Sequence, residues 1–203
     1  MNNKEHWQHI YSTKLPKEVS WTEEKPVTSL ELIAKFDLPK FAKIIDIGGG
    51  DSLLVDFLLH EGYTNITVLD ISAAAIDRAK MRLGKNAHRV KWIVSDIKDF
   101  TPTESYDLWH DRAAFHFLTE QADMDTYSTL VRTHTKNIVL GTFSINGPLK
   151  CSGLEITQYS EAKFQSIFGE HFKIIECFTL DHTTPFHTTQ NFIFVRMSKN
   201  KIT

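Results

Sequence analysis

The sequence predicts an α/β fold in which helices cover both faces of a mostly parallel β-sheet. Strand and helix patterns alternate from residue 28 to residue 168, and the strand-like runs "KIIDI" and "NIVLGTF" are largely apolar. Near-continuous apolar runs are typical of parallel strands that are buried on both faces. The last two strand-like runs, 172–180 and 190–197, have no helix pattern between them. We therefore expect these two runs to pair as an antiparallel hairpin.

Hydrophobic periodicity and capping signals place the individual elements. The predicted strands span residues 43–47, 65–70, 89–94, about 106–110, 137–143, 172–180 and 190–197. The predicted helices begin at Thr28, Ser52, Ser72, Thr119 and Ser160. Thr28 and Glu31 have the spacing of a capping box, in which each side chain bonds the backbone N–H of the other residue.

Length and composition indicate one domain preceded by a short arm. The 203 residues are enough for a single domain with its own core. The segment 1–27 is polar with scattered Trp7, Tyr11 and Trp21, and we expect an arm or lid there. Residues 28–203 are predicted to form the single domain, as a monomer or a weak homodimer.

Charge and cysteine content bear on partners and location. The net charge of -2 gives no basic excess to hold a nucleic acid, so such a partner is disfavoured. No apolar run approaches the ~20 residues that span a bilayer, and the N-terminus lacks the apolar core of a signal peptide. Cys151 and Cys177 are far apart and are interpreted as free thiols. We therefore expect a cytoplasmic protein with no membrane partner.

The stretch "KIIDIGGGDSLL" (43–54) places a glycine-rich turn between a strand and a helix. Such a turn lets a ligand approach the backbone and meet the N–H groups at the helix start. The dinucleotide motif G-x-G-x-x-G requires a third glycine where this chain has Leu53. Asp46 and Asp51 flank the turn and would repel a pyrophosphate, whereas a positively charged ligand would not be repelled.

Three acidic residues end or follow three successive predicted strands: Asp46, Asp70 and Asp96. Ligands of open α/β sheets bind at the carboxyl ends of the strands, so the three side chains fall on one rim. Asp70 stands twenty residues after Gly50, where an acid can accept both hydroxyls of a ribose. Asp96, with the backbone N–H of Ile97, can read the amino edge of an adenine.

The stretches "IIDIGGGDS", "VLDIS" and "SDI", together with the antiparallel final pair, resemble the class I S-adenosylmethionine-dependent methyltransferases. The resemblance covers about residue 28 to the end. It implies a three-layer, Rossmann-like sheet of seven strands, mostly parallel with an antiparallel last strand. It also implies S-adenosyl-L-methionine as methyl donor and S-adenosyl-L-homocysteine as product. The "PGG" turn usual in the family before the fifth strand is replaced by "THTKN", which predicts a tighter connection.

The resemblance also implies a donor site. Its residues would be Asp46, Gly48, Gly49, Gly50, Asp70, Ile71, Asp96 and Ile97, with Trp21 from the arm closing over the donor. In this assignment the glycines face the methionine portion and Asp46 orients their loop. Asp70 holds the ribose, Ile71 packs on the adenine, and Asp96 contacts the adenine amino group.

The polar cluster "WHDR" at the end of the fourth predicted strand is the candidate catalytic site. His110 or Asp111 can take a proton from an acceptor amine or hydroxyl. Arg112 can hold an acceptor carboxylate with two parallel hydrogen bonds. His116 is interpreted as a core residue with satisfied nitrogens, and no His or Cys spacing indicates a metal.

The methyl acceptor stays open at this point. The stretches "EVSW", "DLWHDRAAFHFLT" and "CSGLEITQY" resemble small bacterial methyltransferases whose acceptors are mostly unassigned, and more distantly the protein-lysine methyltransferases of that class. A nitrogen or oxygen of a small molecule or of a protein side chain fits equally. Two other activities remain open: an NAD-dependent oxidoreductase and a module that binds S-adenosylmethionine without turnover.

Overall fold

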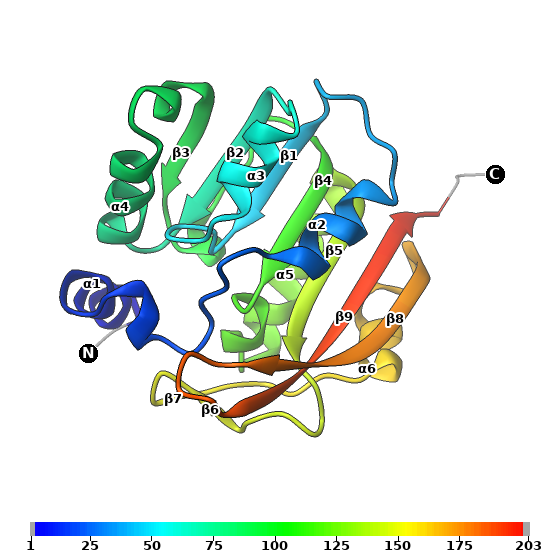
Figure 1. Cartoon of the computed structure of the whole chain (residues 1–203). Coiled ribbons are helices and arrows are strands. Elements are labelled where there is room, and N and C mark those ends of the chain that lie inside the picture. Colours follow the sequence, from blue (N-terminus) through cyan, green and yellow to red (C-terminus); the bar gives the residue numbers. More distant parts are fainter. Residues whose placement is uncertain (1–2, 201–203) are drawn as a thin grey trace.

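The computed structural model describes residues 3–200, and its centre is a seven-stranded sheet in the order β3-β2-β1-β4-β5-β9-β8 (Figure 1). The strands are β1 Lys43–Ile47, β2 Asn65–Asp70, β3 Val90–Val94, β4 Tyr106–Arg112, β5 Thr135–Phe143, β8 Phe172–Thr183 and β9 Thr189–Lys199. A separate two-stranded ribbon joins β6 Lys150–Cys151 to β7 Leu154–Glu155. The predicted fold class is therefore confirmed.

Strand direction follows the prediction as well. The pairs β1–β2, β1–β4, β2–β3 and β4–β5 are parallel. The final strand β9 lies antiparallel between β5 and β8. The hairpin that joins β8 to β9 has no helix, and so the chain returns directly beside the strand it has just left.

Six α-helices and four short 3₁₀ helices accompany the sheet in the described part of the chain. The α-helices are α1 Asn3–Thr13, α2 Val27–Ala34, α3 Leu54–His60, α4 Ala73–Leu83, α5 Gln121–His134 and α6 Glu161–Phe168. The 3₁₀ helices are η1 Pro16–Glu18, η2 Gly84–Arg89, η3 Ile97–Asp99 and η4 Phe115–Phe117. None of the helices within residues 3–200 is long and apolar enough to cross a membrane.

Two apolar clusters fill the spaces between the sheet and its helices. One cluster joins the sheet to α2, α3 and α4 through Leu32, Leu58 and Ile76. The other joins the opposite face to α5 and α6 through Tyr127 and Phe164. Figure 1 shows α2 and α3 in front of the strands and α5 and α6 behind them. The three layers therefore have a core on each side of the sheet.

The predicted helix starts are partly right. Ser72 and Ser160 cap α4 and α6, and their hydroxyls accept hydrogen bonds from backbone N–H groups three residues later. The cap expected at Thr28 is wrong, because α2 already starts after Pro26, which leaves Thr28 inside the first turn. The cap expected at Thr119 is also wrong, because Glu120 occupies that position in α5.

The connection before β5 is short. Helix α5 ends at His134 and β5 begins at the next residue, Thr135. The Thr135 hydroxyl donates to the carbonyl of Tyr106 in the neighbouring strand, at 3.3 Å. The tight connection predicted from "THTKN" is therefore present.

The contact between β5 and β9 at Gly141 gives a test of the packing. A Cβ at Gly141 would lie 2.5 Å from Cε1 of the buried Phe194 ring. We expect Gly141→Ala to lower the free energy of unfolding by about 1–3 kcal/mol, because the ring must move within a filled core. Urea denaturation measures this loss. The double variant with Phe194→Leu should lose less than the sum of the two single losses, and strict additivity would contradict the contact.

Candidate functional site

Two adjoining cavities open at the rim formed by the carboxyl ends of β1, β2, β3 and β4. Tyr11, Trp21, Gly48 and Arg112 line both of them. The second cavity has a volume of about 750 Å³, which lies within the range of small-molecule sites. The rim is where an open α/β sheet binds its ligands.

The first cavity gathers most of the predicted donor residues. Trp21, Gly48, Asp70, Ile71, Asp96 and Ile97 all line it, with Leu69 and Leu118 adding apolar wall. Asp46 and Gly49 line the second cavity. The sequence prediction therefore names residues that the structure brings together from the ends of three strands.

Asp70 ties the glycine turn to the start of α4. Its Oδ2 accepts from the backbone N–H of Gly50 at 3.0 Å, and its Oδ1 accepts from that of Ser72 at 2.8 Å. Burial raises the pKa of Asp70 to about 6, although both hydrogen bonds act to lower it. A carboxylate has about four acceptor positions, so the group keeps capacity for hydroxyl donors from the cavity that it lines.

The glycine turn is sterically closed to larger residues. Gly48 has a φ of 66°, and a Cβ there would lie 2.8 Å from Cβ of Ala114. A Cβ at Gly50 would lie 2.5 Å from Cβ of Ala75 and 2.6 Å from Oδ2 of Asp70. The backbone consequently lies close to the turn after β4 on one side and to α4 on the other.

Asp46 belongs to a buried chain of three polar side chains. Its Oδ1 lies 2.6 Å from Nδ1 of His110, and Nε2 of that ring lies 2.8 Å from Oγ of Ser29 in α2. A carboxylate only accepts, so Nδ1 donates to Asp46, and Nε2 of a neutral ring accepts from the serine hydroxyl. Oδ2 of Asp46 is buried without a hydrogen-bond partner among the described residues. His110 thus fixes one oxygen of Asp46 and leaves the other free beside the glycine turn.

Asp96 and Ile97 lie at the start of η3. Oδ1 of Asp96 accepts from the backbone N–H of Lys98 at 3.0 Å, which caps this short helix. Lys98 also forms an ion pair with Asp123 in α5, at 3.2 Å, and all four of these residues line the first cavity. The far end of the first cavity therefore carries charged groups as well as the apolar Ile97.

Asp111 lies on the α5 side of β4, in the core. Its Oδ1 accepts from the backbone N–H groups of Ala114 and Phe115, each at 3.0 Å, and its Oδ2 accepts from the hydroxyl of Tyr127 at 2.8 Å. The residue has no exposed surface, and burial raises the pKa of its carboxyl to about 6 against these hydrogen bonds. These contacts make Asp111 the anchor of the turn that follows β4.

Arg112 faces the opposite way and borders both cavities. Nη1 donates to the carbonyl of Trp21 at 2.8 Å, and the guanidinium carbon lies 4.9 Å from the centre of the Phe192 ring. Nη2 lies 3.2 Å from Oε1 of Glu23, but neither Nη2 nor Nε makes a hydrogen bond with a described residue. Among the predicted catalytic residues, His110 and Arg112 line cavity wall, while Asp111 supports the turn beneath it.

An aromatic roof formed by the N-terminal segment covers the cavities. Trp7 of α1 lies 5.5 Å from Trp21 and 5.0 Å from Phe117 between ring centres, and Tyr11 lies 6.3 Å from Trp21. Helix α1 was not predicted from the sequence. The spacing of Trp7, Ile10 and Tyr11 at i, i+3 and i+4 is the signal that indicates it.

Other polar candidates have mixed placements. His182 donates from Nε2 to the carbonyl of Ser20 at 2.8 Å and lines the second cavity. His116 is buried as expected, but neither ring nitrogen has a hydrogen-bond partner in the described chain, and burial lowers its pKa to about 3. Tyr159 lies in the core between Phe115 and Phe164. Residues 3–200 contain no group of three or more His, Cys, Asp or Glu side chains that could hold a metal ion.

The comparison with protein families bears on this rim directly. Residues 44–137 match the family model described as "Methyltransferase domain". The match contains the glycine turn, Asp70, Asp96 and the turn after β4. The resemblance to the class I methyltransferases is thereby confirmed.

Curated relatives match parts of this chain. Nodulation protein S of Rhizobium tropici is 37% identical over 59 residues, 29% of this chain and 24% of that protein. Malonyl-[acyl-carrier protein] O-methyltransferase of Anoxybacillus flavithermus is 37% identical over 78 residues, 37% of this chain and 29% of that protein. The chain therefore spans less than a third of the length of each of these two relatives. EEF1A lysine methyltransferase 2 of Homo sapiens is 22% identical over 187 residues, 87% of this chain and 76% of that protein.

Solved structures share the fold over almost the whole chain. The N-methyltransferase NodS of Bradyrhizobium japonicum WM9, in complex with S-adenosyl-L-homocysteine, has a TM-score of 0.76 at 17% identity and covers 99% of this chain and 100% of its own. A SAM-dependent methyltransferase of Anabaena variabilis has a TM-score of 0.76 at 13% identity, covering 98% of this chain and 96% of its own. At such identities the likeness concerns the fold alone.

The contacts of Asp111 give a testable stability effect. We expect Tyr127→Phe to lower the free energy of unfolding by about 1–3 kcal/mol, because it removes a donor to Asp111 and the acceptor of the Trp109 Nε1–H, which lies 2.9 Å from the hydroxyl. Urea denaturation measures the change. The exposed Thr126→Ala on the same helix is the control and should change stability by less than about 0.5 kcal/mol. Equal effects of the two variants would contradict the role of this hydroxyl.

Proposed function

We propose that the protein is an S-adenosylmethionine-dependent methyltransferase that transfers a methyl group to a nitrogen or oxygen of its acceptor. The observation that carries the proposal is the arrangement of Gly48, Asp70 and Asp96 around one cavity at the rim of a methyltransferase domain. By their names, one relative methylates a lysine of EEF1A and another is an O-methyltransferase of malonyl-[acyl-carrier protein]. Nitrogen and oxygen acceptors, on a small molecule or a protein, both stay within the proposal.

The residues present suit such a donor. Asp70 would accept the two ribose hydroxyls, while Asp96 and the backbone N–H of Ile97 would meet the adenine. The unpartnered Oδ2 of Asp46, beside glycines that exclude a Cβ, suits the cationic end of the donor. When bound, the donor supplies an activated methyl group on a sulfonium, so the remaining requirement is an acceptor lone pair held in line.

The two predicted proton acceptors receive positioning roles. His110 orients Asp46, since both of its ring nitrogens are engaged by buried partners. Asp111 holds the turn after β4 with three donors. Trp21 and the rest of the aromatic roof keep water from the cavity, which strengthens electrostatic contacts inside it. Arg112 is the predicted catalytic residue that retains free donors.

Two further expectations accompany the activity. Both cysteines are free thiols, which fits the proposed cytoplasmic location. A monomer or weak homodimer that has no nucleic acid partner remains the proposed state, in keeping with the net charge of -2.

The direct test is calorimetric titration with S-adenosylmethionine and S-adenosylhomocysteine. Saturable binding of both is expected, and absence of both at high micromolar concentration would refute the proposal. A parallel titration with NADH should give no change in cofactor fluorescence. Incubation with methyl-tritiated donor and fractionated lysate then separates protein-bound from small-molecule counts and divides the two acceptor classes.

Asp70 gives the donor site a predicted pH dependence. Its pKa of about 6 means that the group is protonated in more acidic solution and carboxylate in more basic solution. Only the carboxylate can accept both ribose hydroxyls, so affinity for S-adenosylhomocysteine should rise as the pH increases through about 6. Asp70→Asn should bind about tenfold or more weakly and lose this pH step. The control Asp77→Asn, exposed on the same helix α4, should keep both, and an unchanged pH step in Asp70→Asn would contradict the assignment.

A further inference from the structure

We infer that Arg112 is the receptor for a carboxylate on the methyl acceptor, and that Glu23 occupies this receptor when no acceptor is bound. The inference rests on the proposed function and narrows its acceptor to a small carboxylic acid. It follows from the position of one buried guanidinium, from its unused donors and from the strap that crosses it.

The guanidinium of Arg112 has unmet hydrogen-bonding capacity. Its side chain is only 11% exposed, and of its donors, Nη1 is engaged by the carbonyl of Trp21. Nε and Nη2 are buried and make no hydrogen bond within the described residues. These two nitrogens lie on one edge of the planar group and match the two oxygens of a carboxylate. Buried donors of a charged group are costly when unpaired, so the edge is suited to a ligand.

The location of Arg112 indicates that it faces the methyl acceptor rather than the methyl donor. The residue ends β4 and borders both cavities, whereas the acids Asp70 and Asp96 line only the first of the two. The second cavity also contains His182, from the β8–β9 hairpin, and residues 22–26 of the N-terminal segment. An acceptor that enters from this second cavity meets Arg112 before it reaches the glycine turn.

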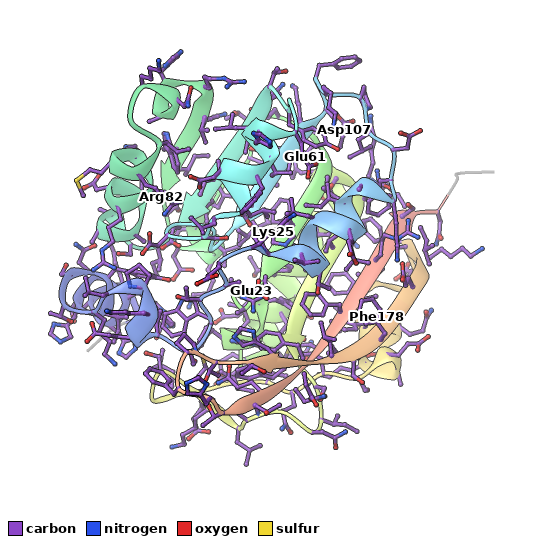
Figure 2. The ribbon with its side chains drawn as sticks, in the orientation of Figure 1. Glu23, Lys25, Glu61, Arg82, Asp107 and Phe178 are labelled. Carbon is purple, nitrogen blue, oxygen red and sulfur yellow. The ribbon has the colours of Figure 1, made fainter. Side chains whose placement is uncertain are left out.

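Glu23 is placed as an internal competitor. Its Oε1 lies 3.2 Å from Nη2 of Arg112 and 3.8 Å from Nδ1 of His182. Figure 2 shows Glu23 on the segment that crosses in front of the sheet between α1 and α2. The Glu23 side chain is 23% exposed, and its contact with Arg112 is an ion pair without a hydrogen bond. Such a partner is weaker than a two-pronged carboxylate contact and can be displaced by one.

The surroundings favour an acid with a flat apolar body. Trp21 lines both cavities beside Arg112, and Phe117 lines the first of them. The buried Phe192 packs on the guanidinium from the core. A protein lysine side chain would bring a positive charge toward the buried guanidinium, which like-charge repulsion disfavours. A small aromatic carboxylate places its charge on Arg112 and its ring against Trp21.

The test measures binding, and it uses carboxylates with their uncharged amides as probes. Benzoate, phenylacetate and anthranilate are each titrated against the corresponding primary amide, with S-adenosylhomocysteine saturating and tryptophan fluorescence or calorimetry as readout. At least one carboxylate should bind about tenfold or more tightly than its amide. Arg112→Gln should abolish this preference, and Arg112→Lys should restore only part of it, because the ammonium lacks the planar fork.

Substitution of Glu23 gives a second, independent test. Glu23→Gln should tighten carboxylate binding several-fold, since the competing charge is gone. Glu31→Gln is the control, because its side chain is exposed on α2 and lines neither cavity, and it should bind as the wild type does. A carboxylate affinity unchanged by Glu23→Gln would overturn the masking role.

A third experiment tests whether Arg112 binds the carboxylate of the acceptor or that of the methyl donor. S-adenosylhomocysteine carries a carboxylate, and 5′-methylthioadenosine does not. Arg112→Gln should change both affinities by the same factor, because Arg112 borders the donor cavity and holds the Trp21 carbonyl. A loss for S-adenosylhomocysteine alone would overturn the inference, because Arg112 would then bind the donor carboxylate. Failure of every carboxylate to bind better than its amide, in both wild type and Glu23→Gln, would also overturn it. Failure of the wild type to bind S-adenosylhomocysteine would instead refute the proposed function.

Discussion

The geometry of the rim depends on the buried carboxylate of Asp111. An isolated charge in the core is costly, and this one is stabilised by the backbone N–H groups of Ala114 and Phe115 and by the Tyr127 hydroxyl. Because two of its donors are backbone groups, Asp111 fixes the course of the chain after β4. That course places Ala114 against Gly48, whose lack of a Cβ leaves room for it. The same turn directs Arg112 to the cavities. One carboxylate in the core thus supports both the glycine turn and the charged wall.

The order of strands and helices could be predicted because each buried element carries several apolar residues in its own characteristic pattern. Apolar runs such as 43–47 and 65–70 have no other stable place than the centre of a sheet, and both strands have the predicted bounds. Ser72 and Ser160 were found because a serine cap acts locally. The caps at Thr28 and Thr119 failed because several adjacent residues can begin a helix, and packing selects among them. Helix α1 was not predicted because only three of its eleven residues are apolar.

The candidate site could also be predicted only in part. The proposed donor residues could be named because strand ends in a parallel sheet meet at one edge, so topology alone brings Asp46, Asp70 and Asp96 together. The roles of neighbours on β4 could not be assigned, since adjacent side chains of a strand point to opposite faces and both faces are buried here. Glu23 was not singled out because its place depends on contacts with β4 and with the distant β8–β9 hairpin. No local pattern in the sequence encodes such a contact.

The N-terminal segment has a consequence for the order in which the molecule is completed. Its carbonyl at Ser20 is bound by His182, 162 residues later, and His6 of α1 reaches Ser152, 146 residues later. During synthesis the first helix emerges long before these two partners exist. Gln8 can already bond Ser72 and Ala74 once α4 has formed, but the contacts with residues 152 and 182 must wait until the end of the chain has been made. Closing such long loops is entropically costly and slow. The roof over the cavities is therefore expected to be the last part to assemble. A newly synthesised chain can then have an intact sheet and still lack a complete ligand site.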